Sequence, residues 1–171
     1  MDRLIRAMLG GDVATFDTMV ADGQGDLYQV TEPDRWNLLH RTLVSVTLTP
    51  SPAIVERLIR LGVDVRAPDV MGNTPLHFAV RGRSLEIVSM LLDAGADIEA
   101  VNADGSTPLR MAFARKPYRP HMVALLLQRG ADMNHRSPTG GLTIRALAET
   151  ICHGTDRAII ELFDRFSSQS G

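Results

Sequence analysis

Residues 72–79 read Gly72-Asn73-Thr74-Pro75-Leu76-His77-Phe78-Ala79, and residues 105–112 read Gly105-Ser106-Thr107-Pro108-Leu109-Arg110-Met111-Ala112. From Gly72 to Gly105 the period is 33 residues. The same period separates Leu61-Gly62-Val63-Asp64-Val65 from Ala94-Gly95-Ala96-Asp97-Ile98, and a third copy reads Arg129-Gly130-Ala131-Asp132-Met133-Asn134. Self-similarity at a fixed period of this length predicts a stack of structural repeats in which each unit contacts its neighbours.

The unit at residues 69–101 shows what each repeated residue type does. Gly72 permits a positive φ in a turn, Thr74 can cap a helix, and Pro75 suits the first helical position, where no N–H is needed. A second helix is indicated by apolar residues at helical spacing, followed by a terminating glycine: Ile87, Val88, Leu91, Leu92 and Gly95. Each unit is therefore predicted to be a turn followed by two helices.

On these residues the chain resembles the ankyrin-repeat family, whose unit is a β-turn finger followed by two antiparallel helices. The resemblance implies an all-α fold: an ankyrin-repeat solenoid of helix-turn-helix units with β-turn fingers, about three central repeats and two capping units. We expect one domain over residues 1–171. Its parts are an N-terminal cap at 1–33, repeats at 34–68, 69–101 and 102–136, and a C-terminal cap at 137–166.

Two central units depart from the pattern. In the unit at 34–68, Leu38-Leu39-His40 aligns with Pro75-Leu76-His77. The second helices of the two units are separated by fewer residues along the chain than these first-helix segments are. About four extra residues are therefore expected between its helices, within residues 47–52, and Arg35 takes the place of the turn glycine. The unit at 102–136 carries a two-residue insertion near residues 115–120, so its inter-helix loop is expected to bulge.

Composition restricts the class of partner. Among 171 residues, 18 basic and 20 acidic side chains give a net charge of −2, which lacks the basic surplus that nucleic-acid binding requires. Cys152 is the only cysteine, so neither a disulfide nor a paired-thiol metal site is available. No stretch is apolar enough to span a membrane, and charges interrupt the amino-terminal residues. We expect a cytoplasmic protein without cofactor or metal, monomeric until it binds a partner.

No group of residues suggests catalysis. His40 and His77 could indicate a metal ligand or an acid–base group, but the ankyrin resemblance implies that this histidine binds backbone groups that join successive fingers. Cys152 and His153 are neighbours on a predicted helix and point about 100° apart, so they do not form a nucleophile–base pair. We expect the protein not to be an enzyme.

The resemblance also indicates where a partner binds. Fingers and first helices line a concave face, where positions that the fold does not specify are free to contact a partner. The candidates are Trp36, Val70, Met71, Asn73, Arg81, Ala103, Asp104, Ser106, Arg110 and Arg115. Trp36 has two interpretations: an exposed hot spot at a finger tip, or a ring folded back to cover the core beside Arg35.

We therefore expect a non-catalytic module that binds another protein through its concave face. Small ankyrin proteins with atypical first repeats resemble immunity proteins, so a bacterial toxin is one partner that the resemblance implies. The alternative is a scaffold or secreted effector that regulates a host or endogenous enzyme. Charge alternates along the chain, with −5 over residues 1–34, +3 over 35–66, −3 over 69–101 and +4 over 102–136. Such stripes could orient a partner or be an ordinary solvated surface.

Overall fold

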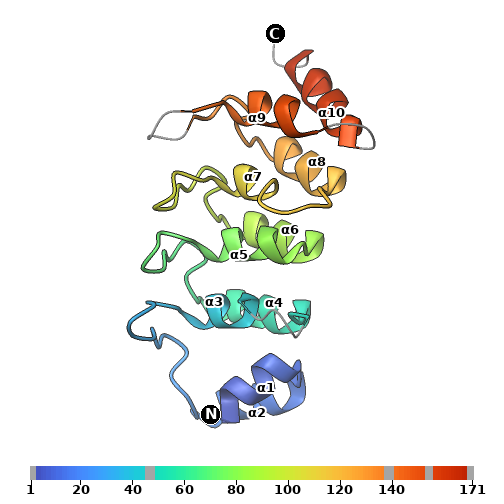
Figure 1. Ribbon diagram of the computed structural model, residues 1–171. Coiled ribbons are helices and arrows are strands. Elements are labelled where there is room, and N and C mark those ends of the chain that lie inside the picture. The colour runs from blue at the N-terminus through green and yellow to red at the C-terminus, as the bar shows by residue number, and fades with distance from the viewer. Residues whose placement is uncertain (1–2, 45–48, 137–140, 153–155, 169–171) are drawn as a thin grey trace.

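The computed structural model describes residues 3–44, 49–136, 141–152 and 156–168. These residues form helices that follow one another in pairs, stacked into an elongated column with the connecting fingers on one side (Figure 1). The pairs are α1 (Arg3–Gly10) with α2 (Val13–Ala21), α3 (Leu38–Leu43) with α4 (Pro52–Arg60), α5 (Pro75–Gly82) with α6 (Leu85–Asp93), α7 (Pro108–Met111) with α8 (Pro120–Gln128), and α9 (Ile144–Ile151) with α10 (Arg157–Ser168). The predicted all-α repeat solenoid is confirmed.

The helices form two rows. The first helices α3, α5 and α7 contact one another in an inner row, and the second helices α4, α6, α8 and α10 contact one another in an outer row. One helix pair lies in each predicted range, and the assignment of the first and last pairs as caps stays a prediction. Within the described parts of the chain, no helix is long and apolar enough to cross a membrane.

The helix starts follow the predicted chemistry. Pro75 and Pro108 occupy the first turns of α5 and α7, directly after Thr74 and Thr107. The Thr107 hydroxyl accepts a hydrogen bond from the Arg110 N–H at 3.3 Å. Thr107 thus satisfies an N–H group that a helix start otherwise leaves without a partner, and proline in the first turn has no N–H that needs one.

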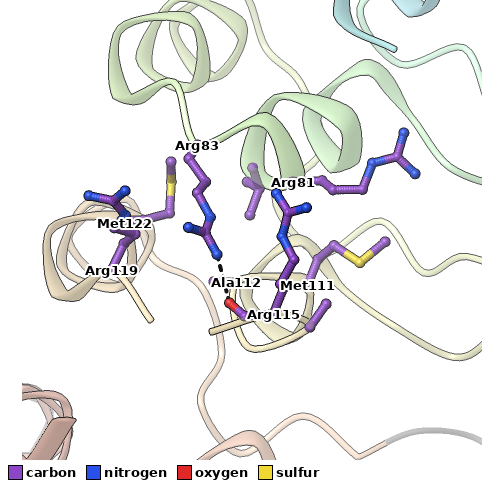
Figure 2. A pocket seen from close by; sticks show the side chains of 9 residues that line it. Arg81, Arg83, Met111, Ala112, Arg115, Arg119 and Met122 are labelled. Carbon is purple, nitrogen blue, oxygen red and sulfur yellow. Dashed lines mark hydrogen bonds between the residues drawn. The ribbon is translucent and has the colours of Figure 1, made fainter. Parts of the chain in front are cut away.

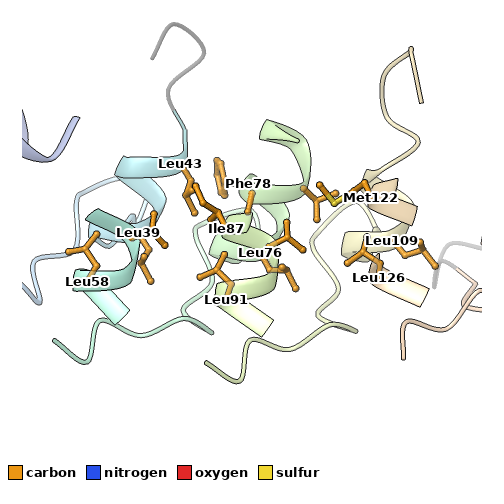
Figure 3. Packing of buried hydrophobic residues seen from close by; sticks show 14 of the residues in the cluster. Leu39, Leu43, Leu58, Leu76, Phe78, Ile87, Leu91, Leu109, Met122 and Leu126 are labelled. Carbon is orange, nitrogen blue, oxygen red and sulfur yellow. The ribbon is translucent and has the colours of Figure 1, made fainter. Parts of the chain in front are cut away.

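The core runs through the whole stack because the same positions are apolar in successive units. Its centre is drawn in Figure 3 and includes three leucines of the inner row and three of the outer row, all with no exposed surface: Leu39, Leu76, Leu109, Leu58, Leu91 and Leu126. A single helix pair would expose one side of this row to water. Stacking therefore supplies the burial that stabilises each unit.

The two predicted insertions lie in inter-helix loops. Residues 44–51 separate α3 from α4, whereas only Arg83 and Ser84 separate α5 from α6. Residues 47 and 48 of the range predicted for the first insertion lie outside the described residues. Residues 112–119 separate α7 from α8, and α7 is shortened to a single turn. The inner row is therefore irregular at the same end of the helices in both units.

Gly72 lies where two fingers approach closely. Its φ is 75°, a left-handed conformation that side chains with a Cβ rarely adopt. A Cβ built on Gly72 would lie 3.2 Å from the Asn102 Cα and 3.3 Å from the Ala103 nitrogen. Both the conformation and the neighbouring backbone therefore require glycine at this position.

We predict that Gly72→Ala lowers the free energy of unfolding by about 1–2 kcal/mol from the backbone conformation alone, with the contact to the next finger adding to this loss. Urea denaturation measures the change. Gly82→Ala is the matched control, because Gly82 lies within α5 and nothing is within 4 Å of its added Cβ. The control should be neutral or slightly stabilising. Equal stability of both variants would contradict this account of Gly72.

Candidate functional site

The surface predicted to bind a partner is built on three fingers, defined by the backbone hydrogen bond that closes each. The first finger, residues 31–36, is closed by the Thr31 N–H donating to the Trp36 carbonyl at 3.0 Å. The second finger, residues 69–73, and the third finger, residues 102–106, are closed in the same way at 2.9 and 3.1 Å. Each finger is thus a turn with a fixed backbone rather than an open loop.

Further hydrogen bonds join each finger to the next. The Val70 N–H donates to the Asp34 carbonyl at 2.9 Å, and the Ala103 N–H donates to the Met71 carbonyl at 2.8 Å. The Asn102 side-chain amide also donates to the Asn73 side-chain oxygen at 2.8 Å. The three fingers therefore form one ladder along the side of the column (Figure 1).

A buried side chain holds the inside of the second finger. The Asp69 carboxylate accepts hydrogen bonds from the Met71 and Asn73 N–H groups at 2.8 and 2.7 Å, and Asp69 is only 6% exposed. Asn102 has the same role in the third finger. The finger tips are consequently held in place while their side chains face solvent: Val70 is 59% exposed and Met71 48%.

His77 connects the second and third units. Its Nδ1 accepts from the Thr74 N–H at 3.1 Å, and its Nε2 lies 3.0 Å from the Ser106 carbonyl oxygen. Because that carbonyl can only accept, we assign the neutral ring with its proton on Nε2. His40 makes the corresponding contact one unit earlier, with its Nε2 3.0 Å from the Asn73 carbonyl oxygen. The predicted role of these histidines in joining successive fingers is confirmed.

Burial lowers the pKa of both histidines, because each ring lies in the core with little exposed surface. The carbonyl acceptors of Asn73 and Ser106 act in the opposite direction and only partly offset burial. Burial therefore favours the neutral form of both histidine rings, and in this form each ring can bind the next finger.

Trp36 covers the core instead of standing free at a finger tip. Its ring is half-buried and meets Phe78 edge-on, with 6.2 Å between ring centroids and an interplanar angle of 80°. Arg35 beside it has a φ of 58° and so adopts the conformation that Gly72 has in the next unit. This geometry agrees with the second interpretation, a ring that covers the core, because Phe78 provides an apolar surface on which the indole packs; a contact between Trp36 and a partner stays a prediction.

The other predicted contact residues fall into two groups. The exposed group contains Val70, Met71, Arg81, Ala103, Asp104 and Arg115. Asn73, Ser106 and Arg110 are half-buried. Of these, Asn73 and Ser106 accept the histidine hydrogen bonds, and the Arg110 guanidinium donates to the Leu142 carbonyl at 3.4 Å. Val70, Met71, Ala103 and Asp104 therefore lie on the second and third fingers, whereas Arg81 and Arg115 lie away from the fingers, in α5 and in the loop before α8.

Comparison with known proteins agrees with this geometry. A family model for ankyrin repeats in three copies matches residues 4–102 and, in an overlapping match, residues 43–137. The chain belongs to the ankyrin-repeat family. Ankyrin-repeat proteins are generally binding modules that contact other proteins. No curated protein matches the chain.

Sequence reasoning missed two residues, Arg83 and Arg119. Together with Arg81 and Arg115 they line a small hollow between the end of α5 and the loop that precedes α8 (Figure 2). Arg83 ends α5 in a left-handed conformation with a φ of 64°. The excess of basic residues at 102–136 was the available signal, but it did not show that Arg83 joins them from the preceding ankyrin repeat.

The other candidates for chemistry are separate from this surface. Within the described ranges, no group of three or more histidine, cysteine or acidic side chains could hold a metal ion. Cys152 is buried, and burial raises the pKa of its thiol, which disfavours the nucleophilic thiolate. His153 lies outside the described residues. The Asp64, Asp97 and Asp132 carboxylates each accept from the N–H two residues later, as the repeated turn requires.

We predict that stability falls as the pH is lowered through 6.5, the ordinary pKa of histidine, and that His77 contributes to the fall. The folded pKa of His77 is lowered, so the unfolded chain binds a proton first as pH decreases. The stabilising contribution is therefore complete above pH 6.5 and is lost below it.

Urea denaturation at several pH values between 7.5 and 5 measures this effect. His77→Gln should lower stability at neutral pH and reduce the pH dependence. Gln128→Ala, at an exposed position of α8 that carries no titratable group, is the control and should leave that dependence unchanged. The same pH dependence in wild type and His77→Gln would contradict the proposed protonation state.

Proposed function

We propose that the protein binds another protein through its concave face of fingers and inner-row helices, and that it does so without catalysis. The observation that carries the proposal is the second finger, where Val70 and Met71 expose apolar side chains on a hydrogen-bonded backbone. Apolar side chains at such tips add nothing to the core. They suit the desolvated centre of an interface, and a rigid finger reduces the entropy lost on binding.

The inner-row helices extend this surface. Arg81 is exposed on α5, and its guanidinium carbon lies 4.5 Å from the centre of the Phe78 ring, which orders the side chain. Trp36 contacts the same ring from the first finger. A partner that extends from the fingers along α5 would also meet the outer part of an indole and an ordered cation, both of which are frequent in binding hot spots.

Within this function we propose an immunity role, in which the concave face covers the active site of a bacterial toxin. A prearranged surface supports the proposal, because inhibition by occlusion requires tight binding and no chemistry. The other role, a scaffold or effector that regulates an enzyme, would use the same surface. The two differ in the consequence of binding and are separated by a functional assay.

We predict that the double variant Val70→Asp, Met71→Asp loses one stoichiometric partner in affinity capture with mass spectrometry from the source organism. Charged groups at the two tips would have to be desolvated in the interface. Trp36→Ala is less suitable because it also removes packing on Phe78. Leu85→Asp is the control: Leu85 is 41% exposed at the start of α6 in the outer row, where an acidic residue suits the helix start.

The control should retain the partner. Both variants should have the same midpoint urea concentration of unfolding as the wild type. Unchanged capture by the finger variant would place the binding site elsewhere on the molecule.

We further predict that cells poisoned by a toxin encoded beside this protein survive when the wild type is co-produced and die with Val70→Asp, Met71→Asp. Colony counts after toxin induction measure survival, and Leu85→Asp should protect as well as the wild type. Partner capture without protection would support the scaffold or effector role instead.

A further inference from the structure

Four arginines, Arg81, Arg83, Arg115 and Arg119, line one hollow and are called here the arginine cluster. They come from two neighbouring ankyrin repeats, two from the end of α5 and two from the loop before α8. In Figure 2 the Arg83 side chain reaches the Arg115 backbone beside Ala112, Arg119 lies next to Met122 at the start of α8, and the Arg81 side chain points away from the other three, toward Phe78. The cluster lies at the end of α5 that is remote from the fingers.

The cluster differs in its ion pairs from several other arginines of the described residues, which pair with carboxylates. In the outer row, Arg57 pairs with Asp17 at 2.7 Å and Arg129 pairs with Asp93 at 2.6 Å. Arg145 likewise pairs with acidic side chains of α9 and α10. No ion pair joins any member of the arginine cluster to an acidic side chain of the described ranges. Some other arginines, such as Arg157 and Arg165 of α10, also form no ion pair within the described residues, so the cluster is distinguished by its four arginines around one hollow.

One hydrogen bond holds two members of the cluster together despite their like charges. Arg83 donates from its Nη2 to the Arg115 carbonyl at 2.8 Å, which ties the two ankyrin repeats to each other. Burial and then the charges of Arg115 and Arg119 lower the pKa of Arg83, as expected for a cation that no anion compensates. Most of the guanidinium N–H donors remain available to a bound group.

We propose that the arginine cluster binds an acidic segment of the partner protein, with aspartate or glutamate carboxylates forming paired hydrogen bonds to the guanidinium groups. The inference rests on the proposed function and adds the chemistry of the partner. Planar guanidinium groups match carboxylates in geometry as well as charge. The hollow itself measures only about 30 Å³, far below a cofactor pocket, so it suits single side-chain groups on a larger surface.

The charge distribution favours a protein segment over nucleic acid. The chain carries a net charge of −2, and residues 69–101, which include Arg81 and Arg83, carry −3. A nucleic-acid backbone would need a continuous basic track over several units. A short acidic segment needs only the local excess of +4 over residues 102–136. Charge complementarity would also fix the register of a partner that contacts the fingers.

The experiment measures fluorescence anisotropy of a labelled octaglutamate peptide with the full-length protein at low salt. The test variant is Arg83→Gly, Arg115→Gln, Arg119→Gln, in which glycine tolerates the positive φ of position 83. The control removes three exposed charges elsewhere, as Arg60→Gln, Arg157→Gln, Arg165→Gln. We expect affinity to fall on the order of tenfold in the test variant and to be retained in the control, with added salt weakening the wild type.

Equal peptide affinity in the two triple variants would overturn the proposal, as would tighter binding of a single-stranded octanucleotide than of the peptide. Affinity capture separates this failure from failure of the proposed function. A partner that is lost from Val70→Asp, Met71→Asp but fully retained by the arginine variant overturns the arginine inference alone. Loss of no partner from the finger variant contradicts the proposed function.

Discussion

The hydrogen bond from the His77 ring to the Ser106 carbonyl, repeated by His40 and Asn73, is the interaction on which the rest of the surface depends. Each ring accepts at the start of its own helix and donates to the following finger, so the helix cap and the inter-repeat contact share one side chain. This couples the position of each finger to the helix behind it. The finger tips then occupy fixed places relative to the inner row, and the apolar side chains at Val70 and Met71 are presented on a prearranged backbone.

Because the histidine rings are buried, this coupling requires them to be neutral. Several charged side chains are likewise paired within the protein. Acidic side chains that support the turns, such as Asp69, are saturated by N–H groups of their own finger. Arg57 and Arg129 of the outer row are paired with carboxylates of neighbouring helices. The exposed side chains of Val70 and Met71 lie at the finger tips, and the arginine cluster, which forms no ion pair among the described residues, lies at the remote end of α5. The side chains that stabilise the fold are therefore different from those that we propose bind a partner.

Much of the fold could be predicted from the sequence because local chemistry and the period agree. Thr74, Pro75 and His77 act where their residue types predict, and the extra residues of two units lie in inter-helix loops. The site was harder to predict because it depends on contacts between units. Trp36 aligned with an exposed position, yet the large ring of Phe78 draws it into partial burial. Arg83 joins Arg115 only because it turns left-handed after α5, a conformation that its residue type does not suggest.

The central claim is that the fingers form one stable ladder with the helices behind them, and amide hydrogen exchange tests it most directly. The Val70 and Ala103 N–H groups bridge successive fingers, so their exchange reports whether the ladder opens by itself. We predict that both exchange as slowly as core amides of α5 and with the same dependence on denaturant. Exchange of these two amides orders of magnitude faster than that of α5 would show that the fingers open independently, and would contradict a prearranged binding surface.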